Sequence, residues 1–173
     1  FPKLLLLLMF LPFLARAQTG AIISGNDRHH PVFAANGMVA SQEAVATKLG
    51  VDILRQGGNA IDAAVAVGFI LAVTLPRAGN LGGGGFMLIH HSQSGETLAL
   101  DYREKAPAKA DRDLFLGPDG ELDKVKARFS HLSIAVPGTV AGLIEAHRRF
   151  GSLPLRAVMT PAITLASKGF IVT

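Results

Sequence analysis

Helical spacing is the commonest pattern of apolar residues along this chain. Val45, Leu49 and Ile53 recur every four residues, as the buried face of an amphipathic helix requires. Ser41 precedes this stretch and predicts the helix cap, because a hydroxyl can accept a hydrogen bond from the first turn. The pair Gly57-Gly58 predicts the end of the helix.

The following segment, from Ala60 to Val73, is apolar nearly all round. Asn59 predicts its cap, and Asp62 suits the first turn because it lies near the positive end of the helix dipole. Pro76 predicts its end. A membrane span takes about 20 apolar residues, so this shorter segment is expected to be a central buried helix.

Further helices are expected after the middle of the chain. Pro137 suits the first turn of one, and Gly151 predicts its end. The last helix is expected over residues 155–168, bent or interrupted at Pro161 and closed by Gly169.

Alternation of apolar and polar residues replaces helical spacing in the middle of the chain. Residues 86–90 and 97–102 are predicted strands, and the loop between them contains glycine at hairpin length. Residues 38–40 are a candidate short strand, whereas residues 105–126 are charged and rich in turns. Helices that flank an antiparallel hairpin indicate a mixed α/β layered fold.

The chain starts with a pattern that is typical of export. An apolar run from Leu4 to Leu14 follows Lys3, and Ala15-Arg16-Ala17 provides a cleavage site with small residues. Residues 1–17 are therefore predicted to be a signal peptide; an uncut membrane anchor and a buried helix are the alternatives. Residues 18–36 are expected to form an extended lead-in.

Composition excludes several classes of protein. The 173 residues are 49% apolar, which excludes an intrinsically disordered chain. Because there is no cysteine, neither disulfides nor a thiolate zinc site can form. The net charge is +4, and two of the 17 basic residues lie in the leader, so no nucleic-acid partner is expected.

The run Gly82-Gly83-Gly84-Gly85 is the most unusual feature of the sequence. Glycine permits a close approach of the backbone to a ligand or to another segment. A phosphate-binding loop is disfavoured, because no Gly-Lys-Ser/Thr follows and the run precedes a strand rather than a helix. The run is therefore either a tight entry to the strand or the wall of a site.

Arg103 at the end of the second strand is the main candidate for binding. Its guanidinium could hold a substrate carboxylate through two parallel hydrogen bonds. Spacing alone favours the alternative, a structural ion pair with Asp101 or Glu104. Asp101 and Glu104 could also form a catalytic pair, although solvated charge is the commoner outcome at a strand end.

The other polar candidates do not assemble a site. Neighbouring residues of a strand point to opposite faces, so His90 and His91 cannot easily share a metal ion, and His29-His30 lies in a predicted loop. Neither Ser41 nor Ser133 lies in the G-x-S-x-G pattern of serine hydrolases. No metal and no cofactor are expected.

Several motifs nevertheless occur together in one order. They are Gly37-Met38-Val39-Ala40-Ser41, Gly57-Gly58-Asn59-Ala60-Ile61-Asp62-Ala63-Ala64, Ala78-Gly79-Asn80-Leu81-Gly82-Gly83-Gly84-Gly85-Phe86, Asp101-Tyr102-Arg103-Glu104 and Val136-Pro137-Gly138-Thr139-Val140-Ala141-Gly142. In these motifs residues 37–173 resemble the amino-terminal part of the large subunit of a gamma-glutamyltranspeptidase, also called glutathione hydrolase.

The resemblance implies the αββα fold of the N-terminal nucleophile hydrolases, only part of which this chain contains. Such enzymes cut their own precursor into a large and a small subunit, which form a heterodimer. The new amino-terminal threonine then attacks the γ-glutamyl amide of glutathione, and water, an amino acid or a peptide takes up the glutamyl group. That threonine belongs to the small subunit, so no catalytic residue is expected in this chain.

For the site, the resemblance implies that Arg103 binds the α-carboxylate of the γ-glutamyl group and that Glu104 stabilises the site. The predicted signal peptide indicates a periplasmic or secreted protein. Truncation at both ends is expected, so the fragment alone should be inactive. Alternatives are a cephalosporin acylase or a poly-γ-glutamate depolymerase of the same fold, a secreted binding module without catalysis, and a membrane-tethered form.

The leader yields a first prediction. Cleavage after Ala17 should give an exported protein that begins at Gln18, and amino-terminal sequencing of the exported protein checks this. A mature protein that keeps Leu4 to Leu14 would instead indicate a membrane anchor.

Overall fold

The helix predicted after Ser41 forms, but a different residue caps it. The computed structural model describes residues 31–78 and 80–172, and α1 spans Ala44–Arg55. Glu43 is its N-cap: its carboxylate accepts hydrogen bonds from the N–H groups of Val45 (2.9 Å) and Ala46 (2.8 Å). The predicted cap Ser41 is wrong, because its hydroxyl instead bonds the Thr47 hydroxyl at 2.7 Å.

The leader and most of the lead-in lie outside the described residues. The chain divides into residues 1–34 and residues 35–173, and all helices and strands described here belong to the second unit. Residues 38–40 form no strand, which corrects the prediction. Val39 packs beside Gly50 of α1, and no strand among the described residues lies alongside to pair with this segment.

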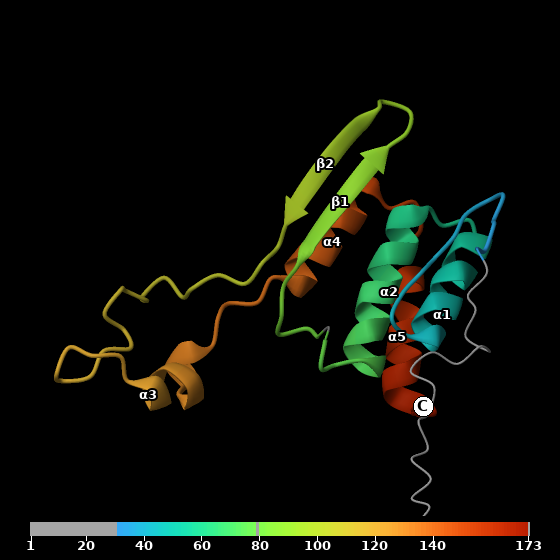
Figure 1. Ribbon diagram of the computed structural model, residues 1–173. Helices are drawn as coiled ribbons and strands as arrows, with labels where there is room; N and C mark the ends of the chain where they lie inside the picture. The colour runs from blue at the N-terminus through green and yellow to red at the C-terminus, as the bar shows by residue number, and fades with distance from the viewer. Residues whose placement is uncertain (1–30, 79, 173) are drawn as a thin grey trace, which may run out of the picture. The chain divides into compact units, whose positions relative to one another are not determined.

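The apolar helix is central, as its sequence predicts. Helix α2 spans Ala60–Thr74, and it packs against α1, α4 (Thr139–Phe150) and α5 (Leu155–Lys168). Figure 1 shows α1 beside α2 and α5 passing behind it. Contact with several helices explains why α2 needs no polar face. None of the helices in residues 31–78 and 80–172 is long and apolar enough to cross a membrane.

A buried carboxylate joins the start of α2 to the connection between α4 and α5. Asp62 is completely buried, and it accepts hydrogen bonds from the N–H groups of Asn59 (2.9 Å), Ser152 (3.0 Å) and Leu153 (3.3 Å). The Asn59 side chain caps α2 and also donates to the Phe150 carbonyl at 2.6 Å. A charge without water needs such partners, so this cluster holds segments some ninety residues apart in the chain.

The hairpin forms as predicted, with slightly shifted bounds. Strand β1 spans Phe86–His91, β2 spans Glu96–Asp101, and they pair antiparallel with Met87 opposite Leu100 and Ile89 opposite Leu98. These four side chains lie on the inward face, whereas the outward face exposes apolar side chains, namely Phe86 and Leu88. The alternation in the sequence therefore predicts the inward face of β2 correctly.

A helix that the sequence did not predict begins at the end of the charged, turn-rich segment. Helix α3 spans Lys124–Phe129 and is capped by Asp123, and the short 3₁₀ helix η2 spans His131–Ser133. No residue of α3 is buried, so apolar spacing could not identify it. Helix α4 begins at Thr139, so Pro137 lies before the N-cap Gly138 and not in the first turn as predicted. Helix α5 has the predicted bounds, and it runs through Pro161 without interruption.

The Asp62 cluster yields a prediction for stability. In the full-length protein, Asp62→Ala should remove the acceptor of three partly buried backbone N–H groups, and a buried group left unpaired costs about 1–3 kcal/mol. We therefore expect the free energy of unfolding, measured in urea, to fall by more than about 1 kcal/mol. Asp52→Ala is the control, because Asp52 makes only an exposed ion pair with Arg55 and should cost about 0–1 kcal/mol. Equal losses in both variants would contradict the assigned role of Asp62.

Candidate functional site

The end of β2 is held between the glycine run and the start of α4. The Tyr102 N–H donates to the Gly85 carbonyl at 3.0 Å, and the Gly85 N–H donates to the Tyr102 carbonyl at 3.4 Å. Beyond the strand, Lys105 and Val136 exchange backbone hydrogen bonds of 3.1 and 2.8 Å. The backbone on either side of Arg103 is thus fixed.

The glycine run also completes the start of α4. Its N-cap Gly138 has no side chain to satisfy the first N–H groups of the helix. The carbonyl of Gly83 accepts from Gly138 (2.9 Å) and Thr139 (3.0 Å) instead. A Cβ on Gly84 would stand 2.6 Å from the Glu104 nitrogen, so a residue with a side chain does not fit. The run is therefore an entry to β1 that packs closely on the candidate site.

Arg103 joins a fixed backbone to an exposed side chain. Its N–H donates to the Asp101 carboxylate at 2.9 Å, and its Nε donates to Glu104 Oε2 at 2.8 Å. The side chain is 67% exposed. The ion pair considered from the sequence forms with Glu104, yet it uses only Nε. Within residues 31–78 and 80–172, neither terminal nitrogen of the guanidinium has a hydrogen-bond partner.

Glu104 is held in its charged form. Its own backbone N–H, the Arg103 side chain and the Gly84 N–H all stabilise the carboxylate, which lowers the pKa of Glu104 below its usual value. A lowered pKa means that the ion pair with Arg103 is present above the usual glutamate range and is lost only as the pH falls through the lower value. The Arg103 side chain is therefore anchored at neutral pH.

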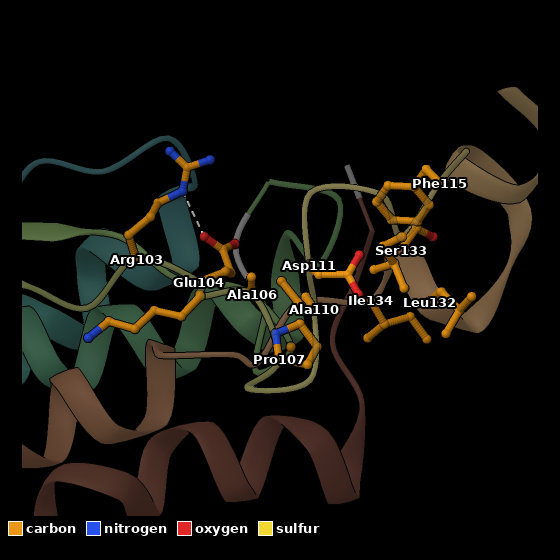
Figure 2. A pocket seen from close by; sticks show the side chains of 14 residues that line it. Arg103, Glu104, Ala106, Pro107, Ala110, Asp111, Phe115, Leu132, Ser133 and Ile134 are labelled. Carbon is orange, nitrogen blue, oxygen red and sulfur yellow. Dashed lines mark hydrogen bonds and ion pairs between the residues drawn. The ribbon is translucent and has the colours of Figure 1, made fainter. Parts of the chain in front are cut away.

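A cavity of about 700 Å³ opens beside this pair. Figure 2 shows Arg103 and Glu104 on one side, Ala110 and Asp111 in the middle, and Phe115 on the far side near η2. Gly82 lines the same cavity. The arrangement offers a carboxylate-binding cation at the edge of a space large enough for a small molecule.

The remaining candidates from the sequence occupy local structural positions. His90 bonds the Thr97 hydroxyl at 3.0 Å, and His91 bonds the Ser94 hydroxyl at 3.1 Å. Ser133 donates to a backbone carbonyl of its own turn. No group of three or more potential metal ligands occurs within the part of the chain that the structure describes, and His29-His30 lies outside it.

Sequence reasoning missed how Tyr102 supports the site. Its ring lies against Gly85 and Gly142, and its burial raises the pKa of the phenol. Gly138 approaches its carbonyl. The spacing of Gly138 and Gly142 by one helical turn, after a strand that ends in an aromatic residue, was the available signal.

The family profile described as gamma-glutamyltranspeptidase matches residues 46–173. Among curated proteins, the glutathione hydrolase proenzyme of Escherichia coli is 60% identical over 84% of this chain, and that of Bacillus subtilis is 43% identical over 78%. This chain covers 25% and 23% of those relatives, so it spans about a quarter of their length.

Solved structures lead to the same group. The Helicobacter pylori gamma-glutamyltranspeptidase has a TM-score of 0.78 at 44% identity, over 83% of this chain and 41% of that one. A cephalosporin acylase from Bacillus halodurans has a TM-score of 0.65 at 27% identity, over 87% and 29%. The α/β fold class, as part of the N-terminal nucleophile hydrolase fold, is thereby confirmed.

Proposed function

The chain belongs to the gamma-glutamyltranspeptidase family, and from this premise we propose that the whole protein is a gamma-glutamyltransferase with glutathione hydrolase activity. Arg103 carries this proposal: it is an exposed cation on a fixed backbone at the edge of a cavity. The names of the relatives support glutathione as the substrate. The cephalosporin acylase is less similar in sequence, so acylase activity is the weaker alternative.

We assign Arg103 to the α-carboxylate of the γ-glutamyl group. Because Glu104 takes only Nε, the two terminal nitrogens of the planar guanidinium remain as donors for a ligand. A carboxylate matches this fork with two parallel hydrogen bonds. Glu104 orients the guanidinium and does not touch the substrate, so its role is positioning.

The bond-breaking chemistry requires residues from the rest of the precursor. In the proposed reaction, the hydroxyl of an amino-terminal threonine attacks the amide carbon and gives its proton to its own α-amine. The carbon–nitrogen bond breaks, and the amine leaves with that proton. Water or an amino group of an acceptor then releases the glutamyl group. The word proenzyme in the relatives' names supports a processed partner subunit, and the leader supports export to the periplasm or beyond.

Substitution of Arg103 in the complete, processed enzyme tests this assignment. Lysine keeps the charge but loses the fork, so Arg103→Lys should raise KM for glutathione and Arg103→Ala should raise it further. A hydrogen bond to a charged group contributes about 1.5–3 kcal/mol, so the affinity should fall roughly ten- to a hundredfold. Self-cleavage of the precursor should persist, and steady-state kinetics with gel analysis measure both quantities.

Arg112→Ala is the matched control, since Arg112 makes an equally local pair with its neighbour Asp113 and is almost fully exposed. It should keep the wild-type KM. The assignment is wrong if Arg103→Ala binds glutathione normally, because the pair with Glu104 would then be purely structural.

The fragment itself provides another test. Residues 18–173 expressed alone should not hydrolyse γ-glutamyl-p-nitroanilide, because the proposed nucleophile belongs to the other subunit. The fragment should also be poorly soluble, since Phe86 and Leu88 on the outward face of the hairpin are 66% and 79% exposed. Absorbance assays and size-exclusion chromatography measure these properties, and an active, soluble monomer would contradict both expectations.

A further inference from the structure

We infer that Gly142 and Gly138 of the α4 start are positioning residues for substrate binding: by seating Tyr102 against the helix backbone, they set where Arg103 projects. The inference rests on the proposed role of Arg103 in binding the α-carboxylate. It gives a function to the motif from Val136 to Gly142, which neither chemistry nor capping by a side chain explains.

Tyr102 packs directly against the backbone of Gly142, with no room for a side chain between them. Gly142 is buried on α4, and a Cβ built there would overlap the Cβ and Cγ of Tyr102 and stand 2.6 Å from its Cδ1. A Cβ on Gly138 would overlap the Tyr102 carbonyl carbon and oxygen. Both the side chain and the backbone of Tyr102 therefore depend on glycine in α4.

The Tyr102 ring also lies close to Gly85. A Cβ on Gly85 would stand 3.0 Å from Cε2 and 3.2 Å from the hydroxyl oxygen of Tyr102. The backbone of Tyr102 is also bonded to Gly85 in both directions. Because its backbone is bonded to Gly85, a displacement of Tyr102 by added volume in α4 is expected to shift the end of the strand as well.

Arg103 is the next residue along the chain. Carbon atoms in contact are separated by about 3.5–4.0 Å, so an added methyl group at Gly142 requires a shift of more than about 1 Å between α4 and Tyr102. A misplacement of about 1 Å at a substrate-positioning group can cost about 10²-fold in rate. Gly142→Ala should therefore damage recognition of the α-carboxylate rather than the chemistry at the amide.

The experiment compares two donors in the complete, processed enzyme. γ-Glutamyl-p-nitroanilide carries the α-carboxylate, and 4-aminobutyryl-p-nitroanilide lacks it but keeps the amine and the scissile amide. For Gly142→Ala we expect the ratio of kcat/KM between the two donors to fall at least about tenfold, mainly through KM of the glutamyl donor. A variant that merely folds less well loses active enzyme equally for both donors, so its ratio stays constant.

Gly50→Ala is the matched control. Gly50 is also a buried helical glycine, but an added Cβ there meets Val67 and Val39 rather than Tyr102. This variant should keep the donor ratio of the wild type even if it is less stable. An unchanged ratio in Gly142→Ala, or an equal fall in both variants, overturns the inference.

Tyr102→Leu covers the case in which Gly142→Ala does not fold. Leucine keeps an apolar side chain but removes the ring that is seated between Gly85 and Gly142, so the donor ratio should fall here too. Arg103→Ala separates the two proposals. If Arg103→Ala leaves the donor ratio unchanged, the proposed role of Arg103 is wrong. If Arg103→Ala lowers the ratio but Gly142→Ala and Tyr102→Leu do not, only the positioning roles of Gly142 and Tyr102 are wrong.

Discussion

The buried carboxylate of Asp62 is the interaction on which the helix packing depends. A charge that is removed from water is costly unless hydrogen bonds replace the water. Asp62 meets this requirement with N–H groups from its own helix start and from the connection between α4 and α5. Hydrogen bonds are directional and apolar contacts are not. The hydrogen bonds of Asp62 therefore fix how α2 is oriented relative to those helices.

This packing reaches the candidate site through α4. The uniformly apolar α2 contacts α4 along the core, where Leu143 is buried next to Gly142. The start of α4 in turn donates hydrogen bonds to the glycine run and packs against Tyr102. Arg103 thus projects from a strand end whose backbone is held from two sides, while its side chain stays exposed to meet a ligand. A fixed backbone with an exposed side chain suits a binding residue, because less conformational entropy is lost when the ligand binds.

Local patterns predicted most elements but not all of their details. The bounds of α5 and the inward face of β2 follow from the spacing of apolar residues, and Gly169 ends α5 in a left-handed conformation with φ +80°. Glu43 could not be identified as a cap, because glutamate is not a preferred N-cap residue. Its carboxylate reaches the N–H groups of the first turn only in the side-chain conformation that the structure shows. Likewise, α3 was missed because a short helix without buried residues leaves no apolar period.

The sequence by itself determined where the four long helices and the two strands of the hairpin lie, and that Arg103 follows a strand end, because these features depend on neighbours within a few residues. It could not decide whether Arg103 pairs with Asp101 or Glu104; the structure gives Nε to Glu104 and the backbone N–H to Asp101. Only the tertiary structure brought Gly142 against Tyr102 and Ser152 against Asp62. Those contacts join segments tens of residues apart, and periodicity carries no information over such separations.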